Sequence, residues 1–155
     1  MANLGWCLKA PHGLELAEPS PRLAADYLSK AEGALVMMRE ATLKEWKVTA
    51  AYYSLYFALY AVLMRLGVKC EIHTCTLLFM RRFLSRYFSS GECALLESGM
   101  KARIDAQYYV GREIPYDVYE QLMQRPPEFL EKCRAIIART GEKDSTEIRA
   151  AVARS

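Results

Sequence analysis

The residues of this sequence with the widest choice of chemistry are its two histidines, His12 and His73. His73 lies between Cys70 and Cys75, so three soft metal ligands fall within six residues. A structural zinc site needs four ligands within tetrahedral reach, and no obvious fourth lies nearby in the sequence. We therefore expect no metal and no other cofactor. Instead, Cys75 should pack in the first turn of a helix, and His73 should tie the preceding loop to a neighbouring helix.

A second group of residues has the charge to bind phosphate. Six basic residues outnumber three acidic ones over residues 81–112, which would give a positive face if the two helices expected there are neighbours. A solvated face with a few ion pairs is the alternative, and composition alone favours it. The basic residues are Arg81, Arg82, Arg86, Lys101, Arg103 and Arg112, and the acidic ones are Glu92, Glu97 and Asp105.

Aromatic side chains form a third pattern. Tyr52, Tyr56 and Tyr60 recur at every fourth position, which places them on one face of a helix. Such a stripe can stack nucleobases. Tyrosines at helical spacing beside an apolar face are more often core or dimer-interface residues, and we expect that role here.

The cysteines and the apolar stretches bear on location. Five cysteines form an odd set without paired spacing, and the first residues lack the charged and apolar regions of a signal peptide. Free thiols in a cytoplasmic protein are therefore expected. The most apolar stretch, residues 50–64, is shorter than the roughly 20 residues of a membrane span. We expect it to be a buried helix, with no membrane contact. The cysteines are Cys7, Cys70, Cys75, Cys93 and Cys133.

Few, long helices are the expected elements. Only eight glycines and six prolines occur in 155 residues, whereas an all-β fold would need turn residues every few positions. We predict an all-α, up-and-down bundle of four to five long helices, with an N-terminal arm and a short extra helix. Residues 1–19 form the arm, residues 20–141 the bundle, and residues 142–155 a charged tail that is frayed or depends on a partner. The apolar arm residues expected to lie against the bundle are Trp6, Leu14 and Leu16.

Capping and breaking residues mark the helix ends. Ser20-Pro21 predicts the start of the first long helix, and residues 42–45 have the form of a capping box that starts the second. Gly67 should end the second helix, which we expect to be central because its apolar residues cover two faces. Further helices are expected over residues 74–88, 92–112 and 118–124, and a last one ends at Gly141. The stripes expected to face inward are Leu23, Tyr27, Ala31, Leu35 and Met38 in the first helix, and Trp46, Ala50, Tyr53, Phe57, Tyr60 and Met64 in the second.

The order and spacing of several segments resembles the HEPN superfamily (higher eukaryotes and prokaryotes nucleotide-binding domain), in particular its small, stand-alone archaeal and bacterial members. The resemblance spans residues 13–140. It implies a four- to five-helix bundle that pairs into a homodimer. Such proteins are often encoded beside a small nucleotidyltransferase, with which they act as toxin–antitoxin-like pairs. The matching stretches are residues 13–16 (GLEL), 24–35 (AADYLSKAEGAL), 51–58 (AYYSLYFA), 67–73 (GVKCEIH), 103–108 (RIDAQY) and 128–130 (EFL).

The resemblance also implies a possible activity. Active HEPN proteins are metal-independent ribonucleases with an Arg-x(4–6)-His motif, in which the arginine steadies phosphate charge and the histidine moves the 2′-hydroxyl proton. Arg103 fits the arginine, but the position after a four-residue gap is Tyr108, and Gln107 stands where relatives commonly have aspartate. A tyrosine is a poor general base at neutral pH, so the motif lacks its base.

We therefore predict a non-catalytic, homodimeric binding module that acts with a nucleotidyltransferase and binds nucleotide or RNA phosphates. Arg103 is the expected anchor, with Tyr108 further along the same side of the helix. Two alternatives stay open: a ribonuclease whose displaced base is His73, and a purely structural bundle whose tyrosine stripe serves dimerisation. The supporting phosphate-binding residues are Arg112, Arg82 and Arg86.

Overall fold

The protein is all-α, as its sequence predicts. The computed structural model describes residues 2–155, and helices occupy most of them, beside one short antiparallel two-stranded ribbon. The strands are β1 (Glu15–Leu16) and β2 (Val68–Lys69). The helices are α1 (Leu4–Lys9), α2 (Pro21–Glu40), α3 (Lys44–Leu66), α4 (His73–Phe83), α5 (Ser90–Tyr108), α6 (Tyr116–Gln124), α7 (Pro126–Arg139) and α8 (Glu142–Ala153).

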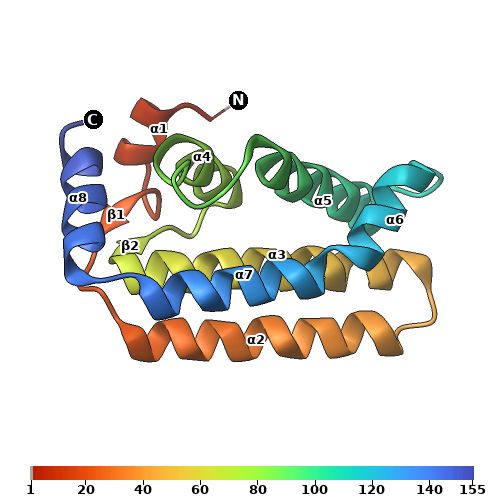
Figure 1. The fold of residues 1–155 in the computed structure, drawn as a ribbon. Helices are drawn as coiled ribbons and strands as arrows, with labels where there is room; N and C mark the ends of the chain where they lie inside the picture. The colour runs from red at the N-terminus through yellow and green to blue at the C-terminus, as the bar shows by residue number, and fades with distance from the viewer. Residues whose placement is uncertain (1) are drawn as a thin grey trace.

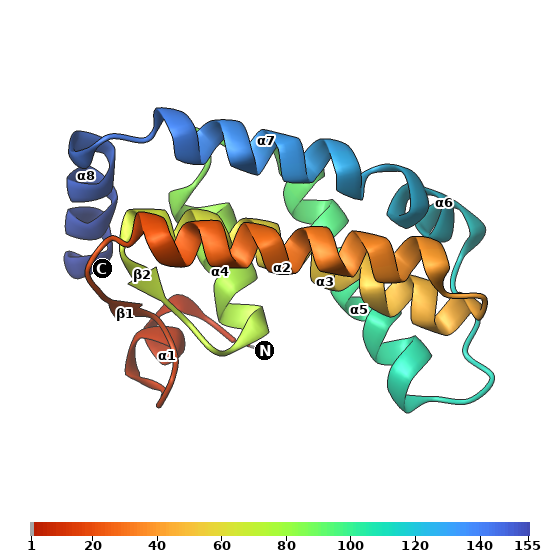
Figure 2. The same cartoon turned by 90° about the horizontal axis from the view of Figure 1, so that it is seen from below.

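Helix α3 is the central element, which confirms the expectation drawn from its two apolar faces. Figure 1 shows α2, α3 and α7 side by side, and Figure 2 shows that α4 and α5 cross α3 at a steep angle. Contacts reach α3 from α2, α5, α6, α7 and α8. Burial therefore extends through every turn of α3 from Val48 to Leu66, as expected of a helix that is apolar almost all round.

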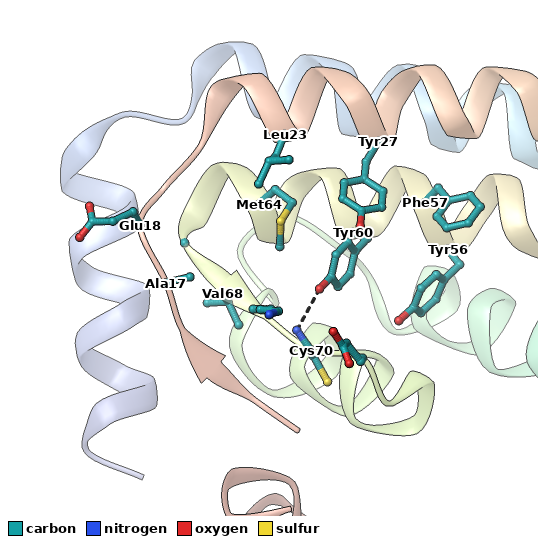
Figure 3. A pocket seen from close by; sticks show the side chains of 13 residues that line it. Ala17, Glu18, Leu23, Tyr27, Tyr56, Phe57, Tyr60, Met64, Val68 and Cys70 are labelled. Atoms are coloured by element: carbon teal, nitrogen blue, oxygen red, sulfur yellow. Dashed lines mark hydrogen bonds between the residues drawn. The ribbon is translucent and has the colours of Figure 1, made fainter. Parts of the chain in front are cut away.

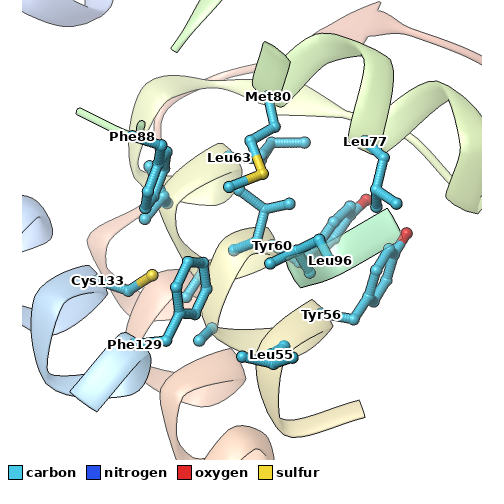
Figure 4. Close-up of a cluster of buried hydrophobic side chains, with 14 of the residues drawn as sticks. Leu55, Tyr56, Tyr60, Leu63, Leu77, Met80, Phe88, Leu96, Phe129 and Cys133 are labelled. Carbon is cyan, nitrogen blue, oxygen red and sulfur yellow. The ribbon is translucent and has the colours of Figure 1, made fainter. Parts of the chain in front are cut away.

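The core lies where four helices meet, and Figure 4 shows its side chains. Leu63 of α3, Met80 of α4 and Leu96 of α5 are all buried there. Phe129 of α7 stacks on Phe88, with 5.4 Å between the ring centroids. A single apolar core thus joins the layer of α2, α3 and α7 to the crossing pair α4 and α5.

Helix caps explain where several elements begin. The Ser20 hydroxyl accepts a hydrogen bond from the amide of Leu23 at 3.1 Å, so the predicted start of α2 is confirmed. Helix α5 begins at a capping box, in which Ser89 and Glu92 each satisfy the other's backbone amide. The capping box predicted at residues 42–45 is wrong. Leu43 occupies the cap position of α3 and makes no side-chain hydrogen bond there.

The ends of two further helices differ from their predicted places. Helix α4 ends at Phe83 rather than Phe88, because the chain turns at Leu84, whose carbonyl accepts the amide of Tyr87. Helix α5 ends at Tyr108, four residues before the predicted end, and Gly111 in the following loop has a positive φ of 83°. Such a φ is incompatible with a continuing right-handed helix.

The two ends of the chain differ from their predictions in different ways. Residues 142–155, expected to be a frayed or partner-dependent tail, contain helix α8. The Ser145 hydroxyl donates to the carbonyl of Leu66 at 2.6 Å, and Ile148 is buried. In the arm, Leu14 is buried as predicted. Trp6 and Leu16 were also predicted to lie against the bundle, but they are 50% and 42% exposed.

Part of the predicted inward stripe lies at the surface. Leu23 in α2 is 44% exposed and Trp46 in α3 is 54% exposed, whereas both were expected to face the core. Ala24 and Leu28 take the inward positions of α2 instead. Tyr53 is only half buried, since nothing within residues 2–155 covers this side of α3 completely.

The turn after α3 fixes the arm to the bundle. Gly67 has a φ of 85°, and its amide donates to the carbonyl of Leu63 at 2.9 Å, which ends α3 as predicted. The carbonyl of Gly67 accepts the amide of Ala17 at 2.9 Å, next to the β1–β2 pairing. A Cβ at position 67 would lie 2.6 Å from the carbonyl oxygen of Ala17. Only glycine therefore fits this crossing.

The cysteines differ from the prediction of five free thiols. Cys7 of α1 and Cys75 of α4 form a disulfide, while Cys70, Cys93 and Cys133 are free and buried. The spacing of the cysteines does not indicate this pair, because its members are 68 residues apart and meet only when the arm folds back over α4. Among residues 2–155 no helix is both long enough and apolar enough to cross a bilayer.

Candidate functional site

Arg103 and His73, both singled out by the sequence, meet beside the tyrosines of α3. The Arg103 guanidinium carbon lies 5.2 Å from the ring centroid of Tyr52 and 5.6 Å from that of Tyr53. His73 is the first residue of α4, and its Nδ1 lies 2.7 Å from the Tyr52 hydroxyl. We call these residues, together with Tyr56, the Arg103–His73 cluster.

A glycine in α5 allows this meeting. Gly99 is buried, and a Cβ there would lie 3.2 Å from Leu122 and 3.3 Å from Tyr52. The absence of a side chain lets α5 approach α3 closely. Arg103 follows Gly99 by four residues and so projects from the same face of α5. This spacing is the one sequence signal that would have placed Arg103 over the tyrosines.

His73 is held by two tyrosines. Its ring stacks on that of Tyr56, with centroids 3.9 Å apart and an interplanar angle of 10°, and it is hydrogen-bonded to Tyr52. The expectation that His73 ties its loop to a neighbouring helix is thus confirmed. Cys75 also packs in the first turn of α4, as expected, and is fully buried.

The electrostatics of the cluster favour neutral groups around one positive charge. Burial lowers the pKa of His73 to about 4, and the positive charge of Arg103 adds to that effect. Burial also raises the pKa of Tyr52 far above its ordinary value, against a smaller lowering by Arg103. At neutral pH the imidazole and the phenol are therefore both uncharged, and the charge of the cluster belongs to Arg103.

Arg103 has no carboxylate within ion-pair distance among the residues that the structure describes. One of its terminal nitrogens donates to the Gln107 side chain at 3.1 Å, and its Nε is buried without a partner. Buried polar groups usually have hydrogen-bond partners. A half-buried cation with spare donors is a natural anchor for an anion.

The other predicted phosphate-binding residues lie elsewhere. Tyr108 is 68% exposed at the end of α5. Arg112 donates to Asp105 at 3.1 Å, and Arg86 pairs with Glu147 of α8 at 3.1 Å. Arg82 lies in the last turn of α4, at the opposite end from His73. The structure therefore does not bring these four residues together with Arg103.

Most of the basic residues over residues 81–112 form ion pairs, as expected from the alternative of a solvated face with a few ion pairs. Arg81 donates to Glu97 at 2.5 Å, and Lys101 shares Asp105 with Arg112. These hydrogen bonds, led by the one from Lys101, lower the pKa of Asp105. A carboxylate already bound by two cations leaves both of them less free to hold phosphate.

The tyrosine stripe is part of the core. Tyr52, Tyr56 and Tyr60 are 0%, 5% and 6% exposed, so other parts of this chain cover their rings almost completely. The Tyr56 hydroxyl is 3.0 Å from that of Thr76, and the Tyr60 hydroxyl accepts the amide of Cys70 at 3.1 Å. Polar tips bonded in this way are typical of core tyrosines.

Metal ligands do not gather at this site. Within residues 2–155 no group of three or more histidine, cysteine, aspartate or glutamate side chains could hold a metal ion. Of the three candidate ligands in residues 70–75, Cys75 is bonded to Cys7, and the Cys70 thiol donates to the carbonyl of Ile72 at 3.3 Å. What the cluster offers a ligand is a cation, the half-buried ring of Tyr53 and a neutral imidazole.

Comparison of the sequence with models of known protein families finds no match, and comparison with curated proteins finds none either.

Proposed function

We propose that this protein is a non-catalytic, HEPN-like binding module that holds a phosphate group of a nucleotide or RNA at Arg103. The observation that carries the proposal is the state of Arg103: half buried, packed over two tyrosine rings, and without a carboxylate partner in the described chain. Guanidinium groups bind phosphate through parallel N–H donors.

The start of α4 adds to this anchor. Its cap residue, Ile72, makes no side-chain hydrogen bond to the first amides of the helix. Free amides and the helix dipole give a helix N-terminus a partial positive charge. Because His73 begins this helix and feels the charge of Arg103, the helix terminus and the guanidinium act on the same small region.

The test is a binding measurement with two probes, ATP and a fluorescent single-stranded RNA oligonucleotide. Arg103→Met keeps an apolar chain over the tyrosines but removes the charge, and should weaken binding about tenfold or more, as the loss of a charged hydrogen bond does. Arg103→Lys should retain part of the affinity. Arg154→Met, at the exposed end of α8, changes the net charge equally and should leave binding unaltered.

Two outcomes would remove this assignment. If Arg103→Met lowers the melting temperature severely, Arg103 is a structural residue. If neither probe binds the wild type at tens of micromolar, the chain is the purely structural bundle that the sequence left as an alternative. Affinity that does not fall with added salt would also contradict a phosphate contact.

The same proposal includes a homodimer and a small nucleotidyltransferase partner, and the resemblance to HEPN proteins is what supports both. Co-purification of the tagged chain with the product of an adjacent nucleotidyltransferase gene tests the partner. Failure of the two purified proteins to form a complex would contradict it.

A ribonuclease is the second candidate, because His73 and Arg103 do lie in one cluster. Its weakness is the low pKa of His73, since a general base works best with a pKa near the operating pH. An RNA cleavage assay in the presence of a chelator separates the two functions. Robust cleavage by the wild type that His73→Ala abolishes would establish the ribonuclease.

A further inference from the structure

A hollow with one cation opens between α2 and α3, on the side of α3 that the rest of the described chain leaves half covered. Its volume is about 460 Å³, which is within the range of small-molecule sites. Ala34, Ala41 and Ala50 are among its lining residues, and their small side chains leave the space open. We call it the Lys30 hollow. Its other lining residues are Lys30, Met37, Trp46, Thr49, Tyr53 and Phe57.

The walls of the Lys30 hollow are apolar and open to solvent. Met37 is 61% exposed and Trp46 54%, and Tyr53 is half buried. The Thr49 hydroxyl is not free to bind a ligand, because it donates to the carbonyl of Glu45 at 2.8 Å. Contiguous exposed apolar surface marks a binding groove or a site of association. A ligand in this hollow would therefore be held mainly through an apolar body.

Lys30 is the one charged residue that lines this hollow in the described part of the chain. Its ammonium lies 4.8 Å from the ring centroid of Phe57 and 5.8 Å from that of Tyr27. Within residues 2–155 no carboxylate lies within ion-pair distance of Lys30. Aromatic rings rather than an acid thus hold the ammonium at the Phe57 end of the hollow. An unpaired cation at the end of an apolar hollow is complementary to an anionic group joined to an apolar chain.

A neighbouring hollow beyond Phe57, drawn in Figure 3, sets the direction of such a ligand. Glu18 and Glu71 line it together with Lys69, so its charged residues leave one net negative charge. A chain laid in this second hollow would cover charged side chains, and an anionic head would be repelled there. The apolar chain of a ligand anchored at Lys30 would therefore run the other way, toward Trp46.

We propose that the Lys30 hollow binds a fatty acid, with the carboxylate on Lys30 and the hydrocarbon chain along α3 toward Trp46. From Phe57 back to Trp46 the helix rises about 17 Å, a length comparable with that of an extended acyl chain. A nucleobase suits these walls less well, because its polar edges would lose their hydrogen bonds with water. Arg103 is not among the lining residues, so the inference does not rest on the proposed binding of phosphate.

The first test uses tryptophan fluorescence, because Trp46 and Trp6 are the only two tryptophans. In a Trp6→Phe chain, dodecanoate below its micelle-forming concentration should shift the emission of Trp46 to shorter wavelength. In a Trp46→Phe chain the emission of Trp6, on α1, should not change. Affinity should rise about fivefold to tenfold from octanoate to decanoate, and again to dodecanoate, as added methylenes are partly buried. No shift of Trp46, or an affinity independent of chain length, overturns the proposal.

The second test concerns the head group. Lys30→Gln should weaken the binding of dodecanoate about fivefold, as the loss of an exposed ion pair can, and leave that of dodecanol unchanged. Lys30→Glu should reverse the preference, so that dodecylamine binds more tightly than dodecanoate. Lys69→Gln is the matched control, because Lys69 lines the neighbouring hollow instead, and it should bind dodecanoate as the wild type does. Equal losses in Lys30→Gln and Lys69→Gln would show an effect of net charge alone and overturn the anchor.

The third test fills the hollow. Ala34→Leu places a larger side chain among its lining residues and should weaken the binding of dodecanoate about tenfold or more. Ala25→Leu makes the same change at an exposed position of α2 and should leave binding unaltered, and circular dichroism confirms that both variants are folded. Undiminished binding by Ala34→Leu overturns the proposal. Sedimentation with phosphatidylglycerol vesicles separates a free fatty acid from a membrane surface: wild type that binds vesicles through Trp46 but does not bind dodecanoate would also overturn it.

Discussion

At the residue scale, His73 is a histidine that the fold removes in large part from water. It stacks on Tyr56, bonds to Tyr52 and lies near the positive charge of Arg103. Burial and the neighbouring cation both disfavour the protonated imidazole, so the two effects add rather than cancel. This explains why the folded protein keeps His73 neutral through the pH range in which a free histidine titrates.

The stability of the protein should therefore depend on pH through His73. Below about pH 6.5 the unfolded chain takes up a proton on this ring, whereas the folded chain does so only near pH 4. The stabilisation is fully present above pH 6.5 and is lost as the pH falls toward 4. Because the ring is partly exposed, we expect a loss on the order of 1 kcal/mol.

Thermal unfolding at pH 7 and pH 5 measures this dependence. The melting temperature of the wild type should fall more between these values than that of His73→Gln, which cannot take up the proton. Equal slopes for the wild type and His73→Gln would show that the ring is not desolvated in the fold.

The sequence identified Arg103 and His73 separately but not their contact. Each was recognisable by type: an arginine in a partial motif, and a histidine between two cysteines. Their meeting depends on the angle at which α4 and α5 cross α3, which no local spacing encodes. The predicted supporters Arg86 and Arg112 do not join them, and each pairs instead with an acid, on α8 and α5 respectively.

At the element scale, local chemistry predicted helix ends where a single residue makes the cap. Ser20 caps α2 through its hydroxyl and Gly67 ends α3 through its positive φ, and both predictions are confirmed. The capping box predicted from Thr42 is wrong because α3 begins one residue later, with Leu43 at the cap position. The apolar period of α3 was equally clear, yet it could not show which of its faces the rest of the chain covers.

Two glycine substitutions should have opposite effects on stability. Gly67→Ala puts a Cβ at a φ of 85° and 2.6 Å from the carbonyl oxygen of Ala17, so we expect a loss of about 2 kcal/mol or more. Gly33→Ala lies within α2, where a Cβ meets nothing within 4 Å, and should stabilise by about 0.5–1 kcal/mol.

Urea unfolding of the two variants, compared with the wild type, measures both effects. A neutral Gly67→Ala would mean that the β1 arm can move away from the end of α3 at little cost. In that case the hydrogen bond from Ala17 to Gly67 would not hold the arm in place.

At the scale of the whole molecule, the fold class could be predicted from the composition and from the helical spacing of apolar residues. The path by which the N-terminal arm folds back onto β2 and α4 could not. Glu15 and Leu16 pair with β2, the amide of Glu71 donates to the carbonyl of His12, and the disulfide joins α1 to α4. These contacts all link the first residues to a segment far along the chain. Long-range pairing of short segments leaves no periodic signal, so the sequence predicted an arm but not its route.

The Cys7–Cys75 disulfide should contribute strongly to stability because it closes a long loop. With a sequence separation of 68 residues, the loss of chain entropy in the unfolded state corresponds to at most about 4 kcal/mol. The urea midpoint of the double variant Cys7→Ala/Cys75→Ala should therefore lie well below that of the wild type. Wild type unfolded and refolded in reductant should behave like the double variant. Alkylation of the denatured, unreduced wild type should modify three thiols, Cys70, Cys93 and Cys133. Modification of five would show that the two cysteines are not joined and that packing and backbone hydrogen bonds hold the arm without them.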